Sequence, residues 1–218
     1  MSTAILACQT LKGELELAIK NTKSDYPVFY IESGLHNNPD CLRERIQQEI
    51  DRLVLDNVSV ILLLFGYCGH GLLGIKSDRA KLVIPKVEDC IPLLLGSCER
   101  KKWISQEMGT YFLTKGWLEG EKNLLNEYDY CCKRYGHARA FKVMQTMLAS
   151  YKRLMIIDTG AYPIDSITPR TQNFANELGL QHEVTDGSIR IITKLLKAQW
   201  DEEFLVLEKG QEITLNMS

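Results

Sequence analysis

The sequence predicts an α/β protein with an open, mostly parallel, doubly wound sheet, helices on both faces and a small C-terminal edge hairpin. Two observations favour this class. Short apolar runs alternate along the chain with segments whose apolar residues recur every three or four positions. The apolar runs are also continuous, which is typical of strands that are buried on both faces of a parallel sheet.

Six runs have the composition expected of such strands. They are Ala4–Ala7, Val28–Ile31, Val58–Phe65, Lys81–Ile84, Leu154–Ile157 and the more weakly patterned Gln181–Val184. Two shorter runs, Phe204–Val206 and Ile213–Leu215, predict the edge hairpin. The segment Gly109–Gly120 breaks the alternation, and its glycines and aromatic residues predict an excursion such as a lid or an interface.

Helical periodicity fills the intervals between the strands. The clearest case is Asp40–Leu55, which follows Asn38-Pro39, a favourable entry to a helix. No internal repeat, low-complexity stretch or linker divides the chain, so we expect a single domain over residues 1–218. The predicted helices are Thr10–Lys20, Asp40–Leu55, Arg139–Tyr151, Pro169–Leu178 and Ser188–Gln199.

Composition excludes several classes of function. The 218 residues carry a formal net charge of -2, whereas nucleic-acid and membrane-surface binding usually depend on a basic excess. No apolar run approaches the roughly 18–20 residues that span a bilayer. The N-terminal segment lacks the basic start of a signal peptide. We therefore expect a cytoplasmic protein that binds neither nucleic acid nor membrane.

Three of the seven cysteines follow predicted strands. Cys8, Cys68 and Cys90 each lie within six residues of a strand end, and His36 follows another strand. The carboxyl ends of parallel strands meet at one edge of the sheet, so these side chains can converge there. Soft sulfur ligands select zinc or iron–sulfur clusters, and a three-cysteine set leaves one position open unless His36 fills it. A metal centre is therefore one interpretation.

Plainer interpretations compete with the metal centre. Cysteine is often a small buried apolar residue, and no CxxC pair is present. A loop histidine such as His36 or His70 is more often a capping or surface residue than a ligand. The glycines Gly66, Gly69 and Gly71 resemble a phosphate-binding loop in composition, although they match neither GxGxxG nor GxxxxGK[ST].

The chain resembles the family known as domain of unknown function 1638 over nearly its whole length. Among the stretches that carry the resemblance are Leu6–Cys8, Glu32–Asn37, Gly66–Gly69, Pro85–Ile91, Gly109–Tyr111, Asp158–Gly160 and Asp186-Gly187.

The resemblance separates three cysteines from the other four. The family pattern implies cysteines at Cys8, Cys68 and Cys90 and a histidine at His36. This chain departs from the pattern at His70, where asparagine is expected, and at Val87-Glu88, where a histidine-type residue is usual. A ligand role for His70 is thereby disfavoured. The pattern does not include Cys41, Cys98, Cys131 or Cys132.

The family is similar to accessory proteins of anaerobes that are found near genes for corrinoid-dependent methyltransferases. The resemblance therefore implies a role in anaerobic methyl and corrinoid metabolism. Together with the three cysteines at strand ends, it leads us to expect a metal- or iron–sulfur-cluster-binding protein of that metabolism. An iron–sulfur cluster is the first choice of cofactor and zinc the second, and the expected partner is a corrinoid protein or a methyltransferase.

Two alternatives stay open, as does the question whether the protein is an enzyme. In the first, a metal-free module binds a corrinoid or nucleotide beneath Trp117 and Tyr111. In the second, a thiol-dependent methyl-transfer enzyme uses one cysteine as nucleophile or methyl acceptor and His36 as base.

Overall fold

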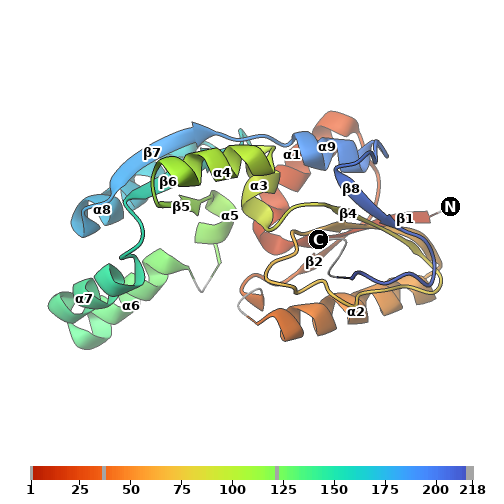
Figure 1. Ribbon diagram of the computed structural model, residues 1–218, viewed down its shortest axis with the longest axis horizontal. Helices are drawn as coiled ribbons and strands as arrows, with labels where there is room; N and C mark the ends of the chain where they lie inside the picture. Colours follow the sequence, from red (N-terminus) through yellow and green to blue (C-terminus); the bar gives the residue numbers. More distant parts are fainter. Residues whose placement is uncertain (1, 36–37, 121–122, 215–218) are drawn as a thin grey trace.

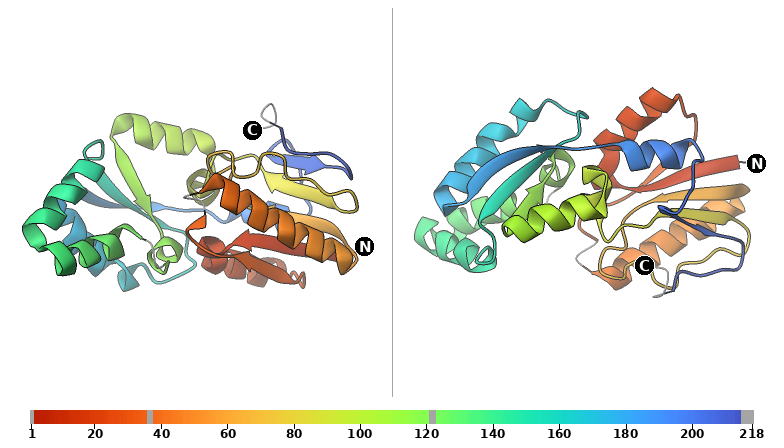
Figure 2. Two further views of the ribbon diagram at one scale, coloured as in Figure 1. Left: turned by 90° about the horizontal axis from the view of Figure 1, so that it is seen from below. Right: turned by 45° about the horizontal axis from the view of Figure 1, so that its top comes forward.

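The computed structural model describes residues 2–35, 38–120 and 123–214 (Figure 1). Their strands form two sheets that lie side by side, each with its own helices (Figure 2). The predicted α/β class is confirmed, because the central sheet is mostly parallel and a C-terminal antiparallel strand closes its edge. Within the described residues, no helix combines the length and apolar character needed to cross a membrane.

The larger sheet has the order β2-β1-β3-β4-β8. Its first four strands are mutually parallel, and β8 pairs antiparallel with β4. The chain adds β2 on one side of β1 and then places β3 on the other side, so a topological switch point lies between β1 and β3. The strand bounds are β1 Ser2–Cys8, β2 Val28–Ile31, β3 Val58–Leu64, β4 Lys81–Pro85 and β8 Phe204–Leu207.

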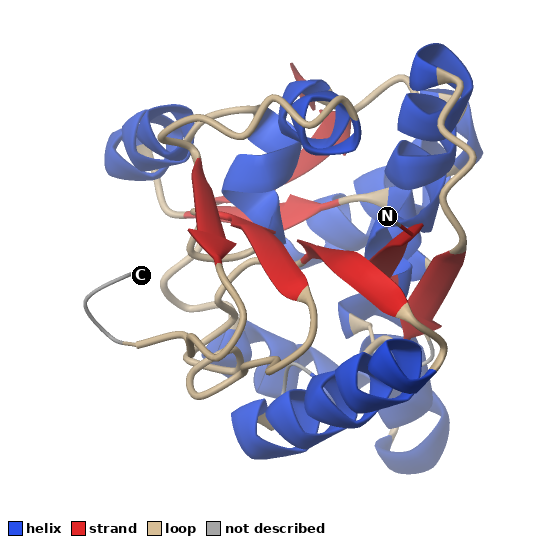
Figure 3. Cartoon of the chain, turned by 90° about the vertical axis from the view of Figure 1, so that its right-hand side faces the viewer, coloured by secondary structure: helices blue, strands red, loops and turns tan. Residues whose placement is uncertain are grey.

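Helices cover both faces of this sheet, as Figure 3 shows end on. Alternate residues of β1 point to opposite faces, because side chains alternate along a strand. Ile5 lies in one buried core with apolar residues of α1 (Lys12–Thr22) and α9 (Arg190–Leu196). Leu6 lies in a second core, with the apolar stripe of α2 (Pro39–Leu55).

The smaller sheet, β5-β6-β7, is entirely parallel. One face packs against helices of its own, including the α6–α7 pair at the lower left of Figure 1. The other face contributes Phe112, Met155 and Ile157 to the core that contains Ile5, so the two sheets share a core. The elements are β5 Thr110–Leu113, α6 Leu124–Tyr135, α7 His137–Met147, β6 Arg153–Asp158, η3 Ile164–Ser166, α8 Thr168–Leu178 and β7 Gln181–Asp186.

The structure corrects three expectations. The strands divide between two sheets, because β8 occupies the free edge of β4 and leaves no place there for β5. The Gly109–Gly120 segment is not only an excursion, since it contains β5 and a short helix, α5 (Lys115–Leu118). Among the described residues the second predicted run does not pair with the first, because β8 pairs with β4 and the backbone of Ile213 bonds to Gly74 and Ile75 instead; Leu215 lies outside the described residues. The single domain over residues 1–218 stays a prediction.

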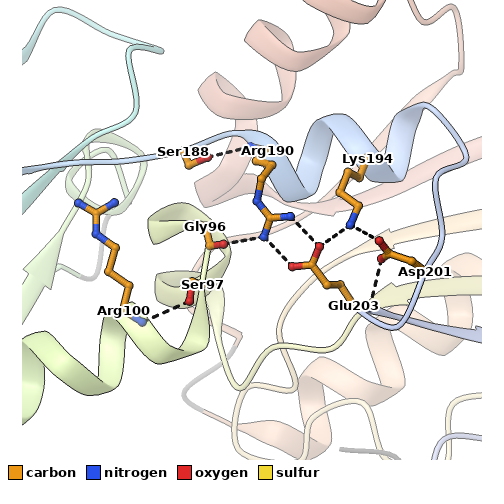
Figure 4. Close-up of polar contacts among 8 residues, drawn as sticks. All are labelled: Gly96, Ser97, Arg100, Ser188, Arg190, Lys194, Asp201 and Glu203. Carbon is orange, nitrogen blue, oxygen red and sulfur yellow. Dashed lines mark hydrogen bonds and ion pairs between the residues drawn. The ribbon is translucent and has the colours of Figure 1, made fainter.

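A polar network anchors the chain where it returns from β7 to the larger sheet (Figure 4). The Ser188 amide donates to the carbonyl of Leu94 at 2.7 Å. Arg190 donates to the carbonyl of Gly96 at 2.7 Å and forms two hydrogen bonds of 2.6 Å with Glu203. These contacts hold the carboxyl end of α3 (Cys90–Leu95) and the start of α4 (Cys98–Glu107), and thereby help to position the residues that precede them.

Candidate functional site

A cavity of about 370 Å³ lies at the carboxyl ends of the four parallel strands of the larger sheet. It is adjacent to the switch point between β1 and β3, where open α/β sheets most often bind ligands. The residues that line it are Cys8, Thr10, Leu11, Glu32, Pro39, Leu42, Phe65, Gly66, Cys68, Gly69, Asp89, Cys90, Ile91 and Trp117.

Cys8 is the last residue of β1 and precedes the 3-10 turn η1 (Gln9–Leu11). Its thiol exchanges a hydrogen bond with the hydroxyl of Thr10 at 3.1 Å. Burial raises the pKa of the Cys8 thiol, and the contacts with Thr10 lower it by a smaller amount. Cys8 therefore reaches the cavity as a protonated thiol in the absence of a cation.

Cys68 lies in the turn that follows β3, with a φ of 45°. Two backbone hydrogen bonds join this turn to the loop after β4, from Tyr67 to Val87 at 3.0 Å and from Cys68 to Glu88 at 2.8 Å. Burial, followed by the charges of Cys8 and Asp89, raises the pKa of the Cys68 thiol to about 12. The ionisation of Cys68 therefore depends on Cys8, which lines the same cavity.

Gly66 allows the loops after β3 and β4 to come together. A Cβ built on Gly66 would lie 2.3 Å from the Cα of Asp89, so any side chain there would collide with backbone. The close approach brings Cys68 toward Cys90, the residue after Asp89.

Cys90 begins α3, and the carboxylate of Asp89 accepts a hydrogen bond from the amide of Ile91 at 2.8 Å as the helix cap. The Cys90 side chain is buried, with 7% exposure. Burial and the charges of Cys68 and Cys8 raise its pKa well above the ordinary value, whereas a hydrogen bond from Trp117 lowers it.

The three predicted cysteines are therefore brought to one cavity, and all seven cysteines of the chain are free thiols. The four that the family pattern leaves out do not line it. Cys41 is exposed on α2, Cys98 begins α4, and Cys131-Cys132 lies in α6. In residues 2–35, 38–120 and 123–214, no three His, Cys, Asp or Glu side chains are arranged as a metal-binding group.

The other predicted site residues divide into three cases. His36 lies outside the described residues. Gly66 and Gly69 line the cavity, whereas Gly71 does not. Gly71 packs against Leu42, and a Cβ built on Gly71 would lie 2.9 Å from the Cδ2 atom of Leu42. His70 is exposed and has a φ of 75°.

The two aromatic residues that were expected to cover a metal-free site lie in different places. Trp117 lines the cavity, but Tyr111 does not and stacks edge-on against Tyr151 with ring centroids 5.3 Å apart.

Lys101 and the apolar wall were not anticipated from sequence. The Lys101 ammonium pairs with Asp89 at 2.6 Å and with Glu88 at 3.3 Å, so it places a positive charge beside the thiols. It lies on α4, and no local pattern links it to the cysteines. The apolar wall of the cavity is formed by Leu11, Leu42 and Phe65. In the sequence these residues look like ordinary core residues, so nothing there indicates that they line a site.

A larger and more polar cavity of about 790 Å³ adjoins the first. Glu32 lines both cavities and pairs with Arg45 at 3.5 Å. The outer cavity also includes Glu44, Gln48 and Glu119. Glu32 therefore lies between the thiol-lined cavity and a polar hollow.

Comparison with known protein families matches residues 30–196 to the family described as "Protein of unknown function (DUF1638)". The match covers Cys68 and Cys90 and begins after Cys8. No curated protein and no solved structure gives a significant match to this chain.

Proposed function

This chain belongs to the DUF1638 family of proteins of unknown function, and we propose that it holds a thiolate-bound metal centre in the cavity lined by Cys8, Cys68 and Cys90. An iron–sulfur cluster is the first choice and zinc the second. The observation that carries the proposal is the convergence of three free cysteines, from three different strand ends, on one cavity at the switch point of the sheet.

The chemistry of the donors fits a soft cation. Sulfur ligands select zinc and iron–sulfur clusters over magnesium or calcium. Cys90 is buried, Cys8 and Cys68 are partly buried, and loss of solvent together with repulsion from neighbouring thiolates raises the pKa values of Cys68 and Cys90. A bound cation offsets both effects and displaces the protons, because metal ligands bind as thiolates. Binding requires the three side chains to turn toward one ion or cluster.

The size of the cavity favours a centre with space beside it. Its volume of about 370 Å³ far exceeds the roughly 10–15 Å³ that one water needs by a comparable measure. A single ion with three sulfur ligands would leave much of this space to a substrate, and a cluster would occupy more of it. Three protein ligands leave a fourth position open in either case.

The properties of the thiols speak against a metal-free thiol nucleophile. Reactive cysteines have lowered pKa values and sit in positive, partly exposed surroundings. Cys68 and Cys90 have raised pKa values, although Lys101 lowers that of Cys68 slightly. The methyl-transfer alternative therefore needs a cation to activate the sulfur.

The metabolic setting is a separate part of the proposal. It rests on the resemblance to accessory proteins found near corrinoid-dependent methyltransferase genes. On that basis the protein acts in anaerobic methyl or corrinoid metabolism, as an enzyme or as an accessory factor, with a corrinoid protein or a methyltransferase as partner.

Metal and sulfide analysis of anaerobically purified protein tests the centre. If the centre is an iron–sulfur cluster, we expect near-stoichiometric iron with acid-labile sulfide and broad visible absorption. If it is zinc, we expect near-stoichiometric zinc with neither sulfide nor visible absorption. Serine variants at Cys8, Cys68 and Cys90 should each lose the metal, whereas C41S and C98S should retain it.

The proposal fails if reconstitution with Fe²⁺ and sulfide, and separately with Zn²⁺, leaves the wild-type protein without metal. It also fails if the C68S and C90S variants bind as much metal as the wild type.

A further inference from the structure

One wall of the thiol-lined cavity comes from a distant part of the chain. Every other described residue that lines the cavity lies within residues 8–91, on the strands, loops and helices of the larger sheet. Trp117 alone among them belongs to α5, which directly follows β5 of the smaller sheet. The cavity is therefore closed by both parts of the fold.

Helix α5 rests on the turn that carries Thr10. A Cβ built on Gly116 would lie 1.9 Å from the carbonyl oxygen of Thr10, so only glycine permits this approach. Thr10 itself lines the cavity and bonds the thiol of Cys8 at 3.1 Å. A displacement of α5 would therefore change the surroundings of Thr10 and the wall of the cavity.

The far end of α5 is held by Asn123. Its side-chain amide donates to the carbonyl of Leu118 at 2.9 Å and to that of Gly120 at 2.6 Å. At the near end, the buried hydroxyl of Thr114 finds no hydrogen-bond partner among the described residues. A buried hydroxyl without a partner costs free energy. The docked position of α5 therefore leaves its N-cap residue, Thr114, without the hydrogen bond that a cap usually forms.

Trp117 also acts on a proposed ligand, because its side chain lowers the pKa of the Cys90 thiol against the larger effect of burial. Donors to sulfur and exclusion of solvent are among the means by which proteins tune thiolate-bound centres. The residue thus combines a cover over the cavity with an effect on the ionisation of one sulfur.

We propose that Trp117 is the positioning residue of the thiol centre, and that exchange of the bound metal requires α5 to move away from Thr10. This inference rests on the proposed function, since it concerns the metal held by Cys8, Cys68 and Cys90. It adds that the smaller sheet controls access to that metal.

Exchange of Co²⁺ tests the inference. Reduced, metal-free protein is loaded with Co²⁺ without oxygen, and extraction by EDTA is followed by loss of the thiolate-to-cobalt absorption. W117A should bind Co²⁺ but release it about tenfold faster or more, and W117F, which keeps a ring but has no N–H, should release it faster than the wild type by a smaller factor. W103F is the matched control, because Trp103 is 67% exposed on α4, and it should behave as the wild type.

Unchanged extraction rates in both W117A and W117F would overturn the inference while leaving the metal centre in place. If W117A does not fold, judged by circular dichroism, W117L and W117F decide the question by the same rates.

If the wild type binds no Co²⁺, the cover is tested on the metal-free protein instead. N-ethylmaleimide should then modify Cys90 about tenfold faster in W117A than in the wild type, with exposed Cys41 as internal reference. Equal rates would refute the cover as well.

Discussion

Gly66 lies against the backbone of Asp89 so closely that a Cβ on Gly66 would be 2.3 Å from the Cα of Asp89. The contact joins the loops after β3 and β4, which carry Cys68 and Cys90. The distance between two of the three proposed ligands thus depends on the absence of one side chain.

G66A should separate these loops. The new methyl group would collide with backbone that has no free rotamer to move aside, so we expect a loss of about 2–4 kcal/mol in the free energy of unfolding. Metal content should fall as well, because Cys68 and Cys90 would move apart. Urea denaturation and metal analysis measure the two effects.

G13A is the matched control for G66A. A Cβ on Gly13 meets nothing closer than the Cβ of Ala161 at 3.8 Å, and Gly13 lies in α1. Alanine should therefore leave stability unchanged or raise it by about 0.5–1 kcal/mol through helix propensity. Equal stability losses in both variants would show that the Gly66 contact has no special importance.

The order of thiol reactivity distinguishes a metal site from a thiol enzyme. In metal-free protein near neutral pH, iodoacetamide should modify exposed Cys41 well before Cys68 or Cys90, whose pKa values are raised by burial. The rate at Cys68 should rise about tenfold per pH unit, since the thiolate is the nucleophile and its pKa is about 12. Peptide mapping by mass spectrometry gives the rates. A cysteine of the cavity that reacts first would instead favour the thiol enzyme.

Glu14 should make stability depend on pH. Its side chain is 1% exposed and accepts a hydrogen bond from the hydroxyl of Thr159 at 2.9 Å, and burial raises its pKa. The unfolded chain therefore loses this proton at lower pH than the folded protein. The free energy of unfolding should fall as pH rises from the ordinary glutamate value through the raised one, by about 1.4 kcal/mol for each unit of difference.

E14Q removes this titration and keeps an acceptor for Thr159. Its unfolding free energy, measured in urea between about pH 4 and pH 8, should vary less than that of the wild type. E16Q changes the more exposed neighbour on the same helix and should leave the wild-type slope intact. Parallel curves for E14Q and the wild type would contradict the prediction.

Glu203 should make the free energy of unfolding depend on pH in the opposite direction from Glu14. Hydrogen bonds from Arg190 and Lys194 lower its pKa to about 2 (Figure 4). The stabilisation is present above the ordinary glutamate pKa and is lost as pH falls through about 2. Because the group is partly exposed, E203Q should cost only about 1 kcal/mol at neutral pH. The difference in the free energy of unfolding between E203Q and the wild type should vanish as pH falls to about 2. A difference that stays constant over this pH range would refute the lowered pKa of Glu203.

The sequence was informative about the site where a residue's position along the chain decides its place in space. Cys8, Cys68 and Cys90 follow strands that were recognisable from continuous apolar runs, and parallel strands deliver their carboxyl ends to one edge. Trp117 lines the same cavity from α5, and Lys101 of α4 pairs with Asp89, which also lines it. The places of both helices depend on packing between distant elements. No local pattern expresses such packing, which is why Lys101 was missed.

The sequence by itself determined the α/β class, the helices on both faces of the larger sheet and the three cysteines at strand ends, because periodicity and strand length are local properties. Only the tertiary structure decided that the strands divide between two sheets, with β8 rather than β5 beside β4. It also decided that the smaller sheet closes the thiol-lined cavity through Trp117. Edge pairing and shared cores depend on contacts between residues far apart in the chain, and those contacts are fixed only when the whole chain is packed.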